Sequence, residues 1–387
     1  MRALNKLDEE GQLLLGVVRE LMGKYGESYW NKMDESQSFP EDFVKEFMKL
    51  GLGAILIPKE WGGGGKGVRE ASLILREINL LGGNSYFVHG HYYLTAMLVR
   101  CAGKEMRDWL FPEVVQGKRV MTLALTEPEA GSDSTRISTL AERQGDRFVV
   151  SGRKVFISRI SHTDYFVLVA RTKRVDEVRK KTEGVTLFLV DANVRGLQMR
   201  KIRTMSNTDA YELALDKVEV PEDRVIGEVD RGFPCLLKTL NAERVMIAAE
   251  LLGNVRWFLE KSVDYAKRRV VFGRPIGANQ GVQFPLAEVY ARLLALEELL
   301  DASVEAVEGE EERRAGEMAN ALKYLSAELA WDAANVAMDV HGGYGYASDL
   351  GIERKLRETR LYKVAPVSQN LALSYIATAV LGLPRSY

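Results

Sequence analysis

The strongest constraint on the fold is a change of pattern near the middle of the chain. Residues 120–225 contain short runs rich in β-branched and aromatic residues, separated by Gly, Asn and Asp, and such runs predict strands. Residues 1–118 and the segment from Gly232 onward instead place apolar residues at helical spacing. The order helices, strands, helices therefore predicts an α+β protein whose strands form a barrel or a sandwich.

Composition and charge argue against several classes of protein. The 387 residues suffice for two or three domains, and 53 Lys and Arg nearly balance 54 Asp and Glu. This balance argues against a broad nucleic-acid-binding surface. Because the chain has no uncharged apolar run long enough to span a membrane and its N-terminus carries early charges, we expect neither a membrane span nor a secretory signal. We expect a soluble, cytoplasmic protein.

The cysteines and histidines give no sign of a metal site. Cys101 and Cys235 lack CxxC spacing, and two cysteines so far apart do not suggest a disulfide framework. Four histidines in the whole chain make a His-based zinc site unexpected. We predict no metal.

A glycine-rich stretch at residues 54–67, AILIPKEWGGGGKG, contains GxGxxG at Gly62, Gly64 and Gly67. A dinucleotide site would require an acidic residue about 20 positions later and alternating strands and helices around the motif. Neither is present, so we interpret the stretch as a tight surface turn.

The stretch most suggestive of chemistry is LALTEPEAGSDSTR, residues 123–136, where an apolar strand leads into a loop of small and hydroxyl residues. Such a loop can present N–H groups and hydroxyls to a cofactor. Its order resembles the first signature of the acyl-CoA dehydrogenase family, matched here from Thr126 to Asp133. Arg136 departs from the family, which usually has a small residue there.

The resemblance covers essentially the whole chain, with five motifs in the same order. They include LIPKEWGGGG, GRKVFISRISHTDYFVLVART, YAKRRVVFGRPIGANQGVQFPLAEVYARL and HGGYGYASDLGIERKLRE. It implies an N-terminal helical domain at 1–119, a middle β-barrel at 120–229 and a C-terminal four-helix bundle at 230–387. It also implies FAD as cofactor, an acyl-CoA substrate, an electron-transfer flavoprotein as partner, and a homodimer or homotetramer.

The resemblance further implies a set of site residues. Phe156 stands where the family usually has Trp, and Asp339 stands where Gln is usual. Ser132 and Arg244 are expected to contact substrate, and Ser132 also the cofactor. The other expected cofactor contacts are Leu123, Leu125, Thr126, Phe156 and Ser158. On a neighbouring subunit, the ADP half of the cofactor is expected to be reached by Arg269, Phe272 and Gln280, with Gly342 and Gly343 beside them.

The catalytic base is expected in an unusual place. Removing a proton beside a thioester carbonyl requires a positioned carboxylate. In many family members that Glu lies in the C-terminal helix–loop, and here the position falls on Pro366 within YKVAPVSQNL. Isovaleryl-type and long-chain members instead place Glu before Arg on the first helix of the bundle, which Glu243 and Arg244 match. Glu243 also lies on an apolar helical stripe, where desolvation raises a carboxyl pKa.

Other interpretations remain open at this point. Glu250 lies near the same stripe and is the reserve candidate for the base. The fold also serves oxidases, flavin monooxygenases and nitroalkane oxidases, and fold alone does not separate them from a dehydrogenase. Use as a reductase and a non-catalytic flavin-binding role are further alternatives.

Overall fold

The computed structural model describes residues 9–309 and 311–385. The chain folds into two compact units that each combine separate stretches of sequence. The helical unit holds residues 1–36, 68–85 and 241–387, and the sheet unit holds residues 37–67 and 86–240. Because neither unit is continuous in sequence, they do not test the predicted domain boundaries, which stay a prediction.

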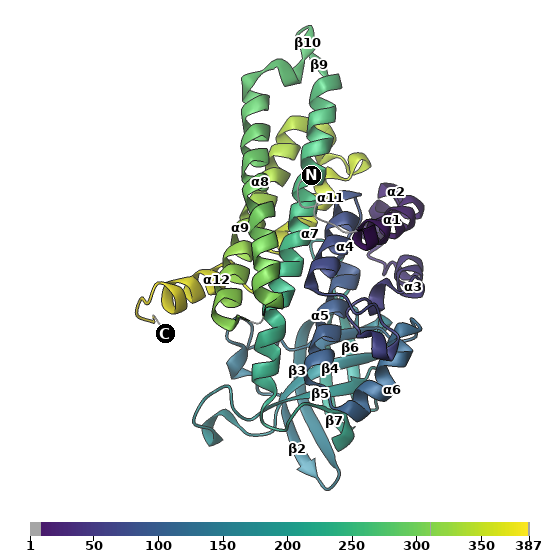
Figure 1. Cartoon of the computed structure of the whole chain (residues 1–387), viewed down its shortest axis with the longest axis vertical. Coiled ribbons are helices and arrows are strands. Elements are labelled where there is room, and N and C mark those ends of the chain that lie inside the picture. The colour runs from purple at the N-terminus through teal and green to yellow at the C-terminus, as the bar shows by residue number, and fades with distance from the viewer. Residues whose placement is uncertain (1–8, 310, 386–387) are drawn as a thin grey trace. The chain divides into compact units, whose positions relative to one another are not determined.

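The sheet unit is built on eight strands of one sheet, in the order β6-β7-β3-β2-β4-β5-β8, with β1 paired to β4 (Figure 1). Apolar side chains on these strands form a continuous core. Three helices accompany the sheet: α3 (Glu41–Lys49), α5 (Tyr86–Cys101) and α6 (Lys104–Val115). The strands are β1 (Met121–Ala124), β2 (Leu140–Gln144), β3 (Arg147–Ser158), β4 (Tyr165–Arg171), β5 (Val185–Asp191), β6 (Leu197–Ile202), β7 (Ala210–Pro221) and β8 (Val225–Ile226).

The predicted strands are present, and the structure adds others. The apolar runs predicted as strands become β1, β3, β4, β5 and β7. β2 and β6 were not among the predictions, because their sequences, LAERQ and LQMRKI, are mostly polar. Most of their side chains are exposed to solvent. A one-sided or exposed strand lacks the apolar run on which the prediction depends.

The structure differs from the prediction that the two cysteines form no disulfide. Cys101, the last residue of α5, and Cys235, in the first turn of α7, form a disulfide across a sequence separation of 134 residues. The prediction of no disulfide framework was therefore wrong. Only the folded chain brings these positions together, and spacing in sequence does not report it.

The helical unit is dominated by three long helices, α7 (Gly232–Arg268), α8 (Gln280–Glu308) and α9 (Glu312–His341) (Figure 1). α7 begins in the sheet unit, since residues up to Leu240 belong there. A short hairpin of β9 (Val270–Val271) and β10 (Arg274–Pro275) joins α7 to α8. The remaining helices are α1 (Glu9–Lys24), α2 (Glu27–Glu35), α4 (Val68–Leu80), α10 (Gly343–Tyr346), α11 (Ile352–Leu361) and α12 (Gln369–Tyr375). None of the helices in the described residues is long and apolar enough to cross a membrane.

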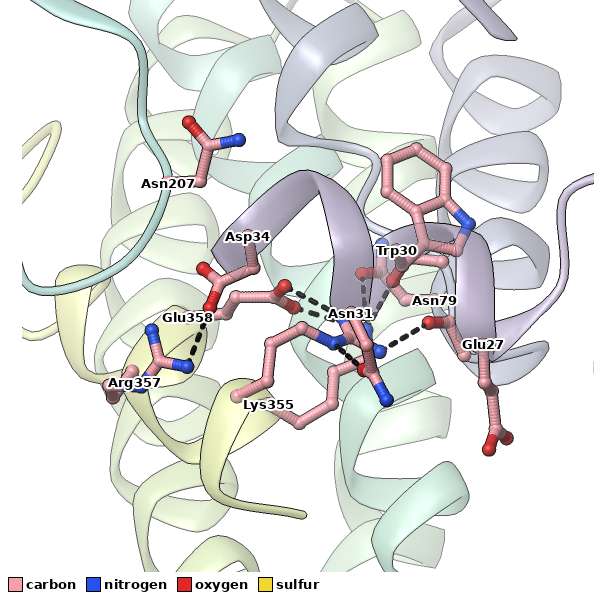
Figure 2. A network of polar contacts seen from close by, with 12 residues as sticks. Glu27, Trp30, Asn31, Asp34, Asn79, Asn207, Lys355, Arg357 and Glu358 are labelled. Atoms are coloured by element: carbon pink, nitrogen blue, oxygen red, sulfur yellow. Dashed lines mark hydrogen bonds and ion pairs between the residues drawn. The ribbon is translucent and has the colours of Figure 1, made fainter. Parts of the chain in front are cut away.

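A buried polar network connects the short helices of this unit to α7 (Figure 2). Lys355 on α11 is fully buried, and its ammonium donates to Asn254 Oδ1 at 2.7 Å, to Asn79 Oδ1 at 3.3 Å and to the Gly83 carbonyl. Arg354 pairs with Glu358 at 2.7 Å. Buried charges need such partners. Lys355 of the HGGYGYASDLGIERKLRE motif thus joins α11 to α4 and α7.

Candidate functional site

A buried ion pair anchors the loop that follows β1. Lys154 on β3 is fully buried and donates to Glu127 Oε1 at 2.8 Å and to the Leu125 carbonyl at 2.9 Å. Glu127 also accepts from the backbone N–H groups of Ser138 at 2.6 Å and Thr139 at 3.0 Å. Burial alone would raise the pKa of Glu127, but Lys154 and these donors outweigh it and lower that pKa to about 2. The carboxylate is therefore charged and structural.

This arrangement positions the first set of predicted cofactor contacts. Leu123, Leu125 and Thr126 follow one another along β1 and its exit, and all three are half-buried. The Thr126 carbonyl accepts from the Val155 N–H at 2.9 Å, which joins the loop to β3. Ser132 lies farther along the loop and is exposed. The structure thus brings Leu123, Leu125 and Thr126 together beside β3 and leaves Ser132 exposed.

Phe156 stands out on β3 because its backbone is left-handed, with φ of 58°. The β3–β7 register shifts between Lys154 and Ile157, so Phe156 lies in an irregularity of the ladder. The residue is 61% exposed. A bulky residue rarely adopts positive φ, and such strain concentrates at binding sites. Bulges also redirect side chains beside active sites.

Ser158, at the end of β3, is the second predicted contact on this strand. Its hydroxyl is hydrogen-bonded to the Tyr86 phenol, and its carbonyl accepts from the Thr122 hydroxyl at 2.6 Å. Ser158 is therefore fixed both to β1 and to the first residue of α5. Sequence reasoning missed Tyr86, because nothing in the SYFVHGHYY run indicates which ring meets β3.

A second group of predicted contacts lines a cavity of about 820 Å³ within the helical unit. Arg269, Phe272, Gly342 and Gly343 all contribute to its wall. Gly342 has φ of 58°, and a side chain added at Gly342 or Gly343 would meet no heavy atom within 4 Å. The backbone at this turn is therefore open to close approach by a ligand.

The expected cofactor contacts and the residues that line this cavity agree only in part. Phe272, at the tip of the β9–β10 hairpin, has φ of 52° and is fully exposed. Gln280, the first residue of α8, is exposed and does not line the cavity. Asp339 does line it. Lining residues that were not among the expected cofactor contacts include Tyr265, Asn279, His341, Tyr344 and Asp349, and Asp349 holds one of the matched positions in the HGGYGYASDLGIERKLRE motif.

Glu243, the predicted base, is buried on α7, with only 3% of its surface exposed. On the predicted apolar stripe, Leu236, Ile247 and Leu251 are buried and Leu240 is half-buried. Its Oε2 atom has no hydrogen-bond partner among the described residues. Burial raises the pKa of Glu243 to about 7; Glu250 reinforces the shift, whereas Arg244 and Lys323 oppose it. A carboxyl with this pKa can accept a proton near neutral pH.

Glu250, the reserve candidate, lies in a different environment. It is 1% exposed and its Oε2 atom accepts a hydrogen bond from the Tyr362 phenol at 2.6 Å. Arg244, which follows Glu243, is also buried, and it donates to Asn241 Oδ1 at 2.9 Å. Burial lowers the pKa of the Arg244 guanidinium. The Oε2 atom of Glu250 therefore accepts a hydrogen bond, whereas the Oε2 atom of Glu243 accepts none from the described residues.

The loop that lacks an acidic residue, 362–371, is held by α9. The buried ammonium of Lys323 donates to the Val367 carbonyl and to Gln369 Oε1, the latter at 2.9 Å. Gln369 in turn donates to Glu328 Oε1 at 2.9 Å. Burial lowers the pKa of Lys323 to about 8, and Arg244 adds to the shift. The polar residues of this loop thus anchor it to α9. No group of three or more metal-ligating side chains occurs among the residues that the structure describes.

Comparison with known proteins identifies the family. Three family models match successive parts of the chain: the acyl-CoA dehydrogenase N-terminal domain at residues 8–118, the middle domain at 122–218 and the C-terminal domain at 230–381. Acyl-CoA dehydrogenase FadE12 of Mycobacterium tuberculosis is 31% identical over 98% of this chain and 98% of its own length.

Two further relatives span nearly the whole chain. The 3-(aryl)acrylate reductase of Clostridium sporogenes is 31% identical over 96% of this chain and 99% of its own. A glutaryl-coenzyme A dehydrogenase solved with glutaryl-CoA superposes with a TM-score of 0.90 at 26% identity, covering 98% of this chain and 97% of that one. The chain therefore belongs to the acyl-CoA dehydrogenase family of FAD-dependent oxidoreductases.

Proposed function

We propose that the protein oxidises an acyl-CoA thioester to the 2,3-enoyl thioester, with Glu243 as the base that removes the α proton. The observation that carries the proposal is the state of Glu243: it is buried, its pKa is about 7, and its Oε2 atom has no partner among the described residues. Such a carboxylate is available to a substrate proton.

The residues present fit FAD on two observations. Two aromatic side chains at positive φ, Phe156 and Phe272, are exposed, as rings meant to lie against a ligand would be. The open backbone at Gly342 and Gly343 fits close approach by a phosphate or a ribose. We propose that Leu123, Leu125, Thr126, Ser132, Phe156 and Ser158 hold FAD. We further propose that Arg269, Phe272 and Gln280, with Gly342 and Gly343 beside them, reach the ADP half of the FAD on a neighbouring subunit.

When bound, FAD supplies a two-electron acceptor for the hydride that leaves the β carbon. Glu243 takes the α proton onto its carboxylate, and the apolar stripe around it excludes water from that transfer. Arg244 and Ser132 are proposed substrate contacts. Arg244 also favours the charged form of Glu243, because its guanidinium opposes the effect of burial on the Glu243 pKa.

The electrons must then leave the protein. We propose an electron-transfer flavoprotein as the acceptor, since one relative, the CarC subunit of a caffeyl-CoA reductase–Etf complex from Acetobacterium woodii, is named for such an assembly. We also propose a cytoplasmic homodimer or homotetramer with domains at 1–119, 120–229 and 230–387. The fully exposed Phe272 supports self-association, which light scattering on the purified holoprotein would test.

An anaerobic titration tests the reaction. Wild type and Glu243→Gln are mixed with short, branched and long acyl-CoAs while the visible absorbance of the flavin is followed. We expect one class to bleach the wild-type flavin, and the variant to retain FAD without bleaching. Rapid reaction of the reduced enzyme with oxygen would contradict the dehydrogenase proposal and favour an oxidase.

A second candidate is the reverse reaction, reduction of an enoyl substrate. The observation that favours it is the 31% identity with the 3-(aryl)acrylate reductase. Reoxidation of the reduced flavin by an enoyl-CoA, faster than reduction of the oxidised flavin by the matching acyl-CoA, would support that direction.

A further inference from the structure

The cavity of about 820 Å³ in the helical unit is lined by charged side chains of both signs. Two arginines come from the connection between α7 and α8: Arg269 directly follows α7, and Arg274 lies on β10. Two acids come from later in the chain: Asp339 lies in the last turn of α9, and Asp349 follows α10. A cavity of this size admits a group as large as a nucleotide.

These charges do not neutralise one another. Asp339 and Arg269 line the same cavity, yet their side chains form no ion pair or hydrogen bond with any residue that the structure describes. The Arg274 guanidinium donates to Asn279 Oδ1 at 2.7 Å, and that amide leaves its charge in place. Uncompensated charges of both signs around one cavity favour a ligand that carries matching groups of both kinds.

His341, the last residue of α9, adds a hydrogen-bond acceptor to the cavity lining. Its Nδ1 atom lies 2.8 Å from the Ala337 carbonyl oxygen. Because that oxygen can only accept, Nδ1 carries the hydrogen and Nε2 has a lone pair. Burial lowers the pKa of the imidazole, so the ring is neutral at neutral pH. The ring lies against Tyr265, with the two centroids 4.5 Å apart, and this contact holds its orientation.

We propose that Asp339 and His341 bind the ribose hydroxyls in the ADP half of FAD and exclude a nucleotide whose ribose carries a phosphate. In the proposed function, on which this inference rests, the cavity receives the ADP half of the FAD on a neighbouring subunit. The selectivity matters because the protein must handle two nucleotides built on ADP. FAD has free ribose hydroxyls there, whereas the CoA of the substrate carries a phosphate on its ribose.

The chemistry of the two side chains favours a ribose over a phosphate. A ribose offers two hydroxyl donors, and the Asp339 carboxylate and the neutral His341 ring offer acceptors. A phosphate carries negative charge, which the carboxylate repels. Acidic residues of dinucleotide sites bind a ribose hydroxyl in this way, and an arginine is needed there for a ribose phosphate. Arg269 and Arg274 remain for the pyrophosphate, which guanidinium groups bind through paired hydrogen bonds.

Position 339 also distinguishes this chain from most of its family, which usually has Gln there. A Gln amide is uncharged and both donates and accepts, so it does not repel a phosphate. The Asp339 carboxylate accepts only and is negatively charged. The preference for an unphosphorylated ribose should therefore depend on the residue at this position.

The test compares four flavin dinucleotides on the full-length protein freed of its cofactor. They are FAD, its analogue with a 3′-phosphate on the adenosine ribose, its 2′,3′-dideoxyadenosine analogue, and flavin hypoxanthine dinucleotide, which lacks the adenine amine. Isothermal titration calorimetry without substrate gives each dissociation constant. We expect wild type to bind FAD about tenfold or more tighter than the phosphorylated and the dideoxy analogues. The hypoxanthine analogue should lose less affinity than the dideoxy analogue.

Asp339→Asn keeps the shape of the side chain and removes its charge, so it should reduce the preference for FAD over the phosphorylated analogue about tenfold. His341→Phe keeps a ring against Tyr265 and removes Nε2, so it should reduce the preference over the dideoxy analogue about fivefold. Asp332→Asn is the matched control, because Asp332 lies on the same helix, pairs with Arg292 at 2.8 Å and does not line the cavity. It should change neither preference.

Equal affinity of wild type for FAD and the phosphorylated analogue, or an unchanged preference in Asp339→Asn, overturns the inference. A larger loss for the hypoxanthine analogue than for the dideoxy analogue would assign the acceptors to the adenine amine and also overturn it. Because binding is measured without acyl-CoA, the expected preferences in a protein whose flavin no acyl-CoA bleaches would reject the proposed reaction and retain the roles of Asp339 and His341.

Discussion

Two glutamates, one in each unit, are nearly equally buried and yet have opposite properties. Glu127 in the sheet unit is 4% exposed and its pKa is lowered to about 2. Glu243 in the helical unit is 3% exposed and its pKa is raised to about 7. Burial raises the pKa of both, so the difference comes from their neighbours.

The neighbours differ in kind. Glu127 receives a lysine ammonium and two backbone N–H groups at hydrogen-bond distance, which stabilise its charge. Glu243 has charged groups nearby but leaves Oε2 without a partner among the described residues. A fully satisfied carboxylate holds structure, whereas an unsatisfied one is available for proton transfer. The comparison separates a structural carboxylate from a proposed catalytic one without reference to fold.

The largest expected effect is on Glu243. Glu243→Gln should lower the rate of flavin reduction by about 10²–10⁴-fold, because it removes the positioned base and keeps the shape. Stopped-flow absorbance measures that rate. Glu250→Gln is the control, and its loss should be much smaller since Glu250 is bonded to Tyr362. If the Glu250 variant loses more than the Glu243 variant, the assignment of the base is reversed.

The next largest effect is expected on stability, when Lys154, the ion-pair partner of Glu127, is replaced. Lys154→Met leaves a buried carboxylate without its cation and should lower the free energy of unfolding by roughly 3–5 kcal/mol. Urea denaturation measures the change. The double variant Glu127→Gln/Lys154→Met should recover most of it, because no buried charge remains. Arg143→Met breaks an exposed pair with Glu222 and should cost at most about 1 kcal/mol. A similar cost for the two single variants would show that Glu127 is not held as described.

The pH dependence of stability should have opposite signs at the two sites. The pKa of Glu243 in the folded protein is about 7, above the ordinary glutamate value of 4.5, so stability falls as pH rises from 4.5 to about 7. Glu243→Gln should abolish that loss, which is up to about 3 kcal/mol for a shift of this size. Glu127 instead contributes stability that disappears as pH falls from 4.5 towards about 2.

Denaturation curves from pH 4 to 8 for wild type and the Glu243→Gln variant provide the measurement. Their difference in unfolding free energy should grow between pH 4.5 and 7 and then stay constant. A difference independent of pH would mean that Glu243 titrates normally in the folded protein.

The smallest effect concerns Lys323, whose charge favours ionised Glu243. Lys323→Met should move the acidic limb of the kcat/KM profile to higher pH by less than about one unit. Lys363→Met is the matched control, because Lys363 pairs with Glu328 at 2.7 Å on the same loop. An equal displacement in both variants would point to general loosening of the loop, and an unmoved limb in Lys323→Met would remove the electrostatic role.

The sequence predicted what depends on local pattern. The helices, the apolar strands and the buried stripe around Glu243 follow from spacing of apolar residues. β2 and β6 were missed because their residues are polar and exposed. The left-handed backbone of Phe156 was also missed, because Phe has no intrinsic preference for it and the register shift with β7 imposes it.

The site was predictable only in part for a related reason. Family motifs led to Glu243 and to four of the residues around the helical-unit cavity. The hydrogen bond that distinguishes Glu250 from Glu243 comes from Tyr362, which is far from both in sequence. The contact that anchors loop 362–371 comes from Lys323, which is also distant from that loop in sequence. Such pairings are set by packing of distant segments, and one sequence carries no signal for them.

The disulfide between Cys101 and Cys235 also changes the connectivity of the polypeptide. It closes a covalent ring that includes every strand from β1 to β8. A protease that cuts once in the segment between β4 and β5 would open the ring without releasing a fragment. Such a nicked chain would migrate as one species on a denaturing gel and separate into two only after a reducing agent is added.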